Sequence, residues 1–84
     1  MVRASYTIKN EEGLHARPAT DFCKTAGRFE SDITIIKDGE EFEAKSILMV
    51  LCMGAVKGDT IELVIDGKDE REALGALIET LDAE

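Results

Sequence analysis

The sequence holds few of the residues that cross-link or interrupt a small fold. Among its 84 residues there are two cysteines, one proline and one histidine. Cys23 and Cys52 lie far apart among apolar neighbours, and neither belongs to a C-x-x-C motif. This spacing argues against a redox motif and against a disulfide framework. We therefore predict two buried thiols that stay reduced.

Positive charge and long apolar runs are also scarce. Ten Lys and Arg residues oppose 18 Asp and Glu residues, so the formal net charge is -8. That balance argues against nucleic acid or an anionic membrane surface as the main partner. No apolar stretch is long enough to span a bilayer, and residues 1–12 lack the apolar segment of a signal peptide. We therefore expect a cytoplasmic protein with no membrane insertion.

Apolar periodicity predicts seven elements in the order β-α-β-β-α-β-α. The Asp38-Gly39 pair between two strand-like runs indicates a hairpin, since both turn positions need a positive φ. Three small helices can cover only one face of four strands, so we predict an α+β open-faced β-sandwich with a four-stranded antiparallel sheet and one domain over 1–84. The uncovered face should carry Ser5, Thr7, Thr34 and Glu62. The predicted strands are 4–9, 32–37, 40–43 and 60–65, and the first two predicted helices are 16–28 and 46–53. The last helix is predicted from an apolar stripe that runs from Ala73 to Leu81, with Glu70, Arg71, Glu72 and Glu79 outside it.

The short helix at 46–53 has too many apolar residues for a one-sided core face. Ser46 is predicted as its N-cap, and Gly54 as its end. The side chains expected to point inward are Met49, Val50 and Met53. The apolar side chains left outside would form a contiguous docking surface, which is how exposed apolar patches often function. They are Ile47, Leu48 and Leu51, and the basic residues expected around them are Arg17, Lys24, Lys45 and Lys57.

The segment GLHARPA, residues 13–19, holds both the histidine and the proline. Proline is tolerated in the first turn of a helix, so a helix begins either at Pro18, with Arg17 as its cap, or at Ala16. Either start puts His15 beside a helix N-terminus, where free N–H groups and the helix dipole stabilise an anion. The Arg17 guanidinium suits phosphoryl oxygens. These residues predict that His15 accepts a phosphoryl group and that Arg17 clamps it.

Several kinds of site are missing from the sequence. It has no glycine-rich nucleotide loop, no cluster of metal ligands and no convincing Ser-His-Asp set, so we predict no cofactor and no metal. Such a protein could carry a phosphoryl group but not make or hydrolyse one unaided. Two other classes stay open at this point. One is a small ligand-sensing module, which can share the β-α-β-β-α-β order. The other is an acyl-phosphate hydrolase that uses Arg17. It would need a side chain near Arg17 to position water, and Asn10 is the only amide side chain in the sequence.

The chain resembles a known family over its whole length. GLHARPA, the KSIL stretch at 45–48, Gly54-Ala55 and a last strand closed by Asp66-Gly67 are similar to the histidine-containing phosphocarrier proteins, HPr, of the bacterial phosphoenolpyruvate-dependent phosphotransferase system. The resemblance implies that His15 takes a phosphoryl group from enzyme I and passes it to IIA domains of sugar permeases. It implies that Arg17 holds the group, and that the carrier is not a catalyst by itself.

The resemblance also implies a second modified residue and a docking surface. Ser46 matches the serine that HPr kinase/phosphorylase phosphorylates, and a phosphate on an N-cap is compatible with the helix dipole. A nitrogen-branch carrier, or a purely regulatory homologue acting through Ser46, stays open. We expect a monomer, since a carrier presents one face to successive partners. The partner-binding residues implied are Thr20, Lys24, Lys45, Ile47, Leu48 and Leu51.

Overall fold

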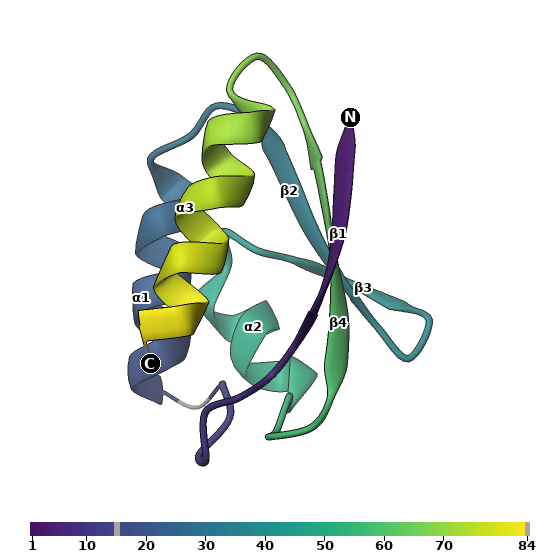
Figure 1. The fold of residues 1–84 in the computed structure, drawn as a ribbon, viewed down its shortest axis with the longest axis vertical. Helices are drawn as coiled ribbons and strands as arrows, with labels where there is room; N and C mark the ends of the chain where they lie inside the picture. Colours follow the sequence, from purple (N-terminus) through teal and green to yellow (C-terminus); the bar gives the residue numbers. More distant parts are fainter. Residues whose placement is uncertain (15, 84) are drawn as a thin grey trace.

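The predicted element order is confirmed in the computed structural model, which describes residues 1–14 and 16–83 (Figure 1). The elements are β1 (Val2–Thr7), α1 (Ala16–Gly27), β2 (Asp32–Lys37), β3 (Glu40–Glu43), α2 (Ile47–Met53), β4 (Thr60–Asp66) and α3 (Glu70–Ala83).

The four strands form one antiparallel sheet in the order β1-β4-β2-β3. Strand β4 lies inside the sheet and pairs with both β1 and β2, so that Ile61 stands opposite Tyr6 and Leu63 stands opposite Ile35. The three helices lie on one face of this sheet (Figure 1). The predicted open-faced α+β sandwich is therefore confirmed.

The core lies between the sheet and the helices. Successive side chains of a strand point to opposite faces, so every second residue of β2 and β4 faces the helices. The residues of these strands that are fully buried are Ile33, Ile35, Ile61, Leu63 and Ile65. Of the residues predicted on the open face, Ser5 and Thr7 are exposed, and Thr34 and Glu62 are half-buried.

The first strand lies two residues earlier than its alternation predicts. It covers Val2–Thr7 because its pairing with β4 runs from Val2 opposite Ile65 to Thr7 opposite Thr60. Ile8 follows the strand and is bonded outside it, through its N–H to the carbonyl of Asp59 at 2.9 Å. The alternation of apolar and polar residues continues beyond Thr7, but β4 begins at Thr60, opposite Thr7, so the pairing ends there.

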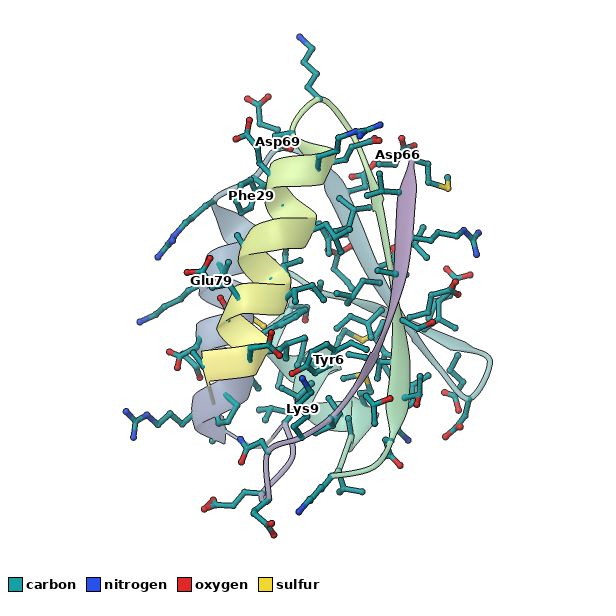
Figure 2. The ribbon with its side chains drawn as sticks, in the orientation of Figure 1. Tyr6, Lys9, Phe29, Asp66, Asp69 and Glu79 are labelled. Carbon is teal, nitrogen blue, oxygen red and sulfur yellow. The ribbon has the colours of Figure 1, made fainter. Side chains whose placement is uncertain are left out.

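Two polar contacts attach the ends of α3 to distant parts of the chain, and Figure 2 labels one residue of each, Tyr6 and Asp69. At its end, the Tyr6 hydroxyl donates to the Asp82 carboxylate at 2.8 Å. Burial and this carboxylate raise the pKa of Tyr6 to about 12. At its start, the Asp69 carboxylate accepts the N–H groups of Glu30 at 2.9 Å and Ser31 at 3.0 Å, and also the Ser31 hydroxyl. These bonds, the Ser31 hydroxyl foremost, hold the pKa of Asp69 below its usual range.

The Asp69 contact predicts a stability that falls in acid. A carboxyl whose pKa is lower in the folded chain stabilises the fold fully above its unfolded pKa, and this contribution is lost as the pH falls through the folded pKa. We expect Asp69→Asn to be less stable than the parent at neutral pH, with a difference that shrinks as the pH is lowered. Urea unfolding between about pH 2 and pH 7 measures this. Asp32→Asn, an exposed carboxyl beside Ser31, is the control; an equal pH dependence in both variants would contradict the assignment.

Candidate functional site

Helix α1 begins directly after the predicted phosphoryl acceptor. His15 itself lies outside the described residues, while its covalent neighbours Leu14 and Ala16 are described. Helix α1 starts at Ala16, the second of the two predicted starts, and Pro18 is buried in its first turn. That first turn carries no acidic side chain. Its partial positive charge is therefore not neutralised by a carboxylate of its own.

Arg17 is the cation at this end of α1. It occupies the second position of the helix and is exposed. Its side chain forms no hydrogen bond or ion pair with any residue that the structure describes. A guanidinium in this situation keeps its planar set of donors available for an oxyanion, and bidentate contacts to phosphoryl oxygens are the kind it makes best.

The loop that leads to His15 rests on the loop that follows α2. The Leu14 N–H donates to the Ala55 carbonyl at 2.9 Å, and the Leu14 side chain is 5% exposed. Gly13 has a φ of +68° and lies so close that a Cβ built there would be 2.4 Å from the Ala55 oxygen and 2.8 Å from the Val56 Cα. Glycine is therefore needed here for two reasons, its positive φ and the close approach of two backbones.

Side chains within this loop are engaged in shaping it. The Asn10 amide donates to the Gly13 carbonyl at 3.4 Å, and its oxygen accepts the Glu12 N–H at 3.2 Å. The Lys57 ammonium pairs with the Glu11 carboxylate at 2.5 Å. Lys57 was expected beside the docking surface, but this contact ties it to the loop before His15.

Helix α2 is capped at both ends as predicted. The Ser46 side-chain oxygen accepts the Met49 N–H at 3.3 Å, and Ser46 has the extended backbone of an N-cap. Gly54 ends the helix with a φ of +65°, and its N–H donates to the Leu51 carbonyl at 3.2 Å. A serine N-cap is worth about 1 kcal/mol to a helix, which gives Ser46 a structural role whether or not it is modified.

The exposure of α2 differs from the prediction at two residues. Val50 and Met53 are buried as expected, but Met49 is 38% exposed and Cys52 is exposed. Each residue of an α-helix turns about 100° from the one before, so a helix this short can bury only a narrow arc. The prediction of an inward Met49 and a buried Cys52 is therefore wrong. Both cysteines are free thiols, and Cys23 is half-buried rather than buried.

The predicted docking residues divide into a groove and an apolar ridge. A groove of about 430 Å³ between α1 and the start of α2 is lined by Thr20, Cys23, Lys24, Lys45 and Ile47. The ridge beside it is Leu48, 71% exposed, and Leu51, 39% exposed. We call these seven residues the α1–α2 face. Cys23 is the member that the sequence analysis missed, although it lies three residues after Thr20 and therefore on the same side of the helix.

Two residues of the α1–α2 face have further contacts that affect their chemistry. The Lys45 ammonium donates to the Phe29 carbonyl at 2.8 Å, so it holds the segment after α1 and is not a free surface charge. Burial raises the pKa of the Cys23 thiol, which keeps it protonated. The Lys24 side chain, in contrast, has no such partner among the described residues, and neither has that of Arg17, which lies outside this face at the start of α1.

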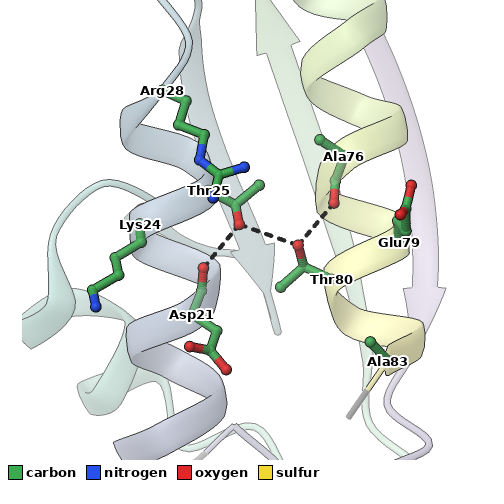
Figure 3. A pocket seen from close by; sticks show the side chains of 8 residues that line it. All are labelled: Asp21, Lys24, Thr25, Arg28, Ala76, Glu79, Thr80 and Ala83. Carbon is green, nitrogen blue, oxygen red and sulfur yellow. Dashed lines mark hydrogen bonds between the residues drawn. The ribbon is translucent and has the colours of Figure 1, made fainter.

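A second groove, of about 480 Å³, lies between α1 and α3 (Figure 3). At its floor the Thr25 and Thr80 hydroxyls are 3.1 Å apart. Each hydroxyl also contacts a carbonyl one turn earlier in its own helix, Thr25 that of Asp21 at 3.0 Å and Thr80 that of Ala76 at 2.9 Å. The floor is thus a polar contact between the two helices. Of the predicted site residues that the structure describes, Lys24 alone lines this groove.

Neither a metal centre nor a membrane helix is found in the part of the chain that the structure describes. No group of three or more His, Cys, Asp or Glu side chains among residues 1–14 and 16–83 could hold a metal ion. Within the same residues, no helix has both the length and the apolar character needed to cross a membrane.

The fold and the surface together define a class of protein. It is a small open-faced β-sandwich in which the N-terminus of α1 and the apolar α1–α2 face lie on the helical side of the sheet. The family model described as the phosphorylation site of the PTS HPr component matches residues 2–83. The HPr-like protein Crh of Halalkalibacterium halodurans is 43% identical over the full length of both chains. The chain therefore belongs to the HPr family of phosphocarrier proteins of the phosphotransferase system.

Solved structures of the family share this fold. HPr-C-His from Thermoanaerobacter tengcongensis is 40% identical, with a TM-score of 0.95 over 99% of this chain and 93% of that one. Crh from Bacillus subtilis, whose structure is described as an intertwined dimer with a swapped domain, is 37% identical, with a TM-score of 0.78 over 100% of this chain and 97% of that one. Proteins of this family carry phosphoryl groups and are not catalytic by themselves, and their partners belong to the phosphotransferase system.

Proposed function

We propose that this protein accepts a phosphoryl group on His15 from enzyme I and passes it to IIA domains of sugar permeases. The observation that carries the proposal is the start of α1 directly after His15, with Arg17 exposed and unpaired among the described residues and no acidic side chain in the first turn. An imidazole is a competent nucleophile toward phosphorus, and a helix N-terminus with a guanidinium stabilises the charge of the transferred group.

Each transfer breaks one bond to phosphorus as another forms. In the first, the bond from phosphorus to its donor atom on enzyme I breaks as a bond forms to a ring nitrogen of His15. In the second, the bond from phosphorus to His15 breaks as a bond forms to the acceptor atom of a IIA domain, and the ring nitrogen regains its lone pair. Arg17 interacts with the phosphoryl oxygens while the group is in transit, since its donors match their geometry. No water takes part, so the group is carried and not hydrolysed.

The α1–α2 face supports docking to successive partners. Apolar side chains at its ridge and lysines at its edge fit the usual composition of an interface, with an apolar centre and a polar rim. One face must serve both enzyme I and the IIA domains, and we propose a cytoplasmic monomer for that reason. The swapped dimer described for Crh is a property of that protein.

A regulatory role through Ser46 is the second candidate. It is favoured by the N-cap geometry of Ser46 and by the 43% identity to an HPr-like protein named Crh. A phosphate at this N-cap would lie where the helix dipole stabilises it, so α2 need not unfold on modification. We propose HPr kinase/phosphorylase as the partner for this reaction. The Asn10 amide is bonded within its own turn, which argues against Asn10 as the water-positioning group of a hydrolase.

Two labelling reactions test these assignments. In the first, the protein is mixed with labelled phosphoenolpyruvate and enzyme I, and we expect a phosphate that is labile in acid and stable in base. In the second, it is mixed with labelled ATP and HPr kinase/phosphorylase, and we expect an acid-stable phosphate on Ser46. A label in the second reaction only would make the protein a regulatory homologue. No label in either would reject both functions.

Arg17→Ala is expected to slow phosphoryl transfer to a IIA domain by about 10²-fold, because one donor that stabilises developing charge typically contributes that much. The substitution leaves α1 intact, since alanine is the best helix former. Single-turnover transfer from the phosphorylated protein to a purified IIA domain measures the rate. Arg28→Ala, which removes an exposed cation just after the far end of α1 and outside the α1–α2 face, is the control. Equal rates for Arg17→Ala and the parent would reject the clamp.

A further inference from the structure

We infer that Asp59 is a positioning residue for phosphoryl acceptance at His15, acting through the peptide group that joins Ala55 to Val56. The inference rests on the proposed function and names a part of the molecule outside the α1–α2 face. The Asp59 carboxylate accepts the Val56 N–H at 3.0 Å. The carbonyl of that same peptide group accepts the Leu14 N–H at 2.9 Å.

A peptide group transmits orientation from one end to the other. It is planar, its C=O and N–H point in opposite directions, and it turns only as a unit. A carboxylate that holds the N–H of Val56 therefore also aims the carbonyl of Ala55 at Leu14. A charged acceptor at the N–H also polarises the group, and hydrogen bonds in a chain strengthen one another.

The loop that carries Asp59 is itself firmly placed. The Asp59 N–H donates to the Val56 carbonyl at 2.9 Å, which closes a turn, and Gly58 and Asp59 exchange backbone bonds with Ile8, each at 2.9 Å. The Lys37 ammonium lies 3.8 Å from the Asp59 carboxylate and is only 17% exposed. The carboxylate is thus held by its backbone on one side and by a cation of β2 on the other.

On the Leu14 side, the chain is closely packed against Ala55 and Val56. Leu14 is anchored in the core by its side chain, and the Gly13 backbone touches Ala55 and Val56 with no side chain between them. Leu14 is the last residue before His15. A tilt of the peptide group at 55–56 would therefore move the chain at the point where it enters the phosphoryl-accepting residue.

Three substitutions separate this role from ordinary stabilisation. Asp59→Ala removes the acceptor of the Val56 N–H, and Asp59→Asn removes the charge but keeps an acceptor oxygen. Asp38→Asn is the matched control. It removes a carboxylate that contacts the same Lys37 ammonium, at 3.1 Å, and asparagine tolerates the positive φ of 53° at that position. Asp38 makes no contact with the peptide group at 55–56 in the described chain.

The experiment measures phosphoryl transfer from enzyme I and hydrogen exchange of the Leu14 amide in each variant. For Asp59→Ala we expect kcat to fall on the order of tenfold, because small misplacements of a reacting group cost that much or more. KM should stay within about twofold, since the docking residues are untouched. Leu14 exchange should quicken by about tenfold while exchange of the core amide of Leu63 does not, which shows local opening. For Asp59→Asn we expect kcat and the Leu14 exchange rate to return most of the way to those of the parent. Asp38→Asn should match the parent in both.

Two results would overturn the inference. One is a kcat for Asp59→Ala within about twofold of the parent. The other is unchanged Leu14 exchange in that variant, which would show that the carboxylate does not hold the peptide group. Failure of the proposed function has a different signature: the parent protein would take no phosphoryl group at all. In that case the exchange measurement still tests whether Asp59 holds Leu14 in place.

Discussion

His15→Ala is expected to abolish the acid-labile phosphate formed with enzyme I and phosphoenolpyruvate. The chain contains one histidine, so no other imidazole can take over the role. Loss of a nucleophile that forms the covalent intermediate removes the reaction path and does not merely slow it. The label should fall to the level of a reaction without enzyme I, measured after base treatment of the separated protein.

The control for this variant uses the other modified residue. Ser46 caps α2 through its own side chain, and its labelling by HPr kinase/phosphorylase requires a folded chain but no histidine. His15→Ala should therefore still accept the acid-stable phosphate. An acid-labile label that survives in His15→Ala would move the acceptor to another residue and remove the basis of the proposed function.

Gly13→Ala is expected to have the second largest effect, on both stability and transfer. The positive φ of Gly13 costs an alanine about 1–2 kcal/mol. The new Cβ would also meet backbone atoms of Ala55 and Val56 at 2.4 and 2.8 Å, and backbone can yield only by moving the loop. We expect a total loss of about 2–4 kcal/mol in the free energy of unfolding, together with a fall in kcat of more than about tenfold. Urea unfolding and transfer from enzyme I measure the two effects.

Two other glycines separate the causes of that loss. Gly39 has a φ of +80° but nothing within 4 Å of a built Cβ, so Gly39→Ala reports the cost of the φ alone. Gly75 lies inside α3 with open space around it, so Gly75→Ala should raise stability by about 0.5–1 kcal/mol. The excess of Gly13→Ala over Gly39→Ala then measures the close approach of the two loops. If the two variants lose equal stability, the contact with Ala55 has no energetic consequence.

The His15→Ala and Gly13→Ala predictions test two parts of the same loop, the reacting residue and the contact that places it. His15 supplies the proposed nucleophile, and Gly13 permits the contact with Ala55 that places the chain before it. The Asp59 variants examine the same contact from its other side. A chain with a normal docking surface but a displaced loop should bind enzyme I as well as the parent and react more slowly, which is why KM and kcat need separate measurement.

Local sequence patterns were sufficient to predict the order of the helices and strands and the two caps of α2. Alternation in β4, the Asp38-Gly39 turn and the Ser46 cap depend on residues within a few positions of one another. The same is true of the GLHARPA segment, whose proline restricts the helix start to two positions and whose histidine and arginine are two positions apart in the sequence. The order of elements and the number of helices then limited the fold to a sheet covered on one face.

Tertiary structure alone decided which apolar residues of α2 are exposed and where the polar contacts between loops fall. Met49 and Cys52 are outside because the core admits one narrow arc of a seven-residue helix. The Lys45 ammonium is bound to the Phe29 carbonyl, 16 residues away, because β2 and β3 pair and bring the segments on either side of their hairpin together. The Asp59 carboxylate reaches Leu14 through the peptide group at 55–56 because pairing of β1 with β4 brings chain segments more than forty residues apart into contact. Periodicity reports which face of an element is apolar. It contains no information about which distant backbone group that element will meet, since that depends on how the whole chain closes.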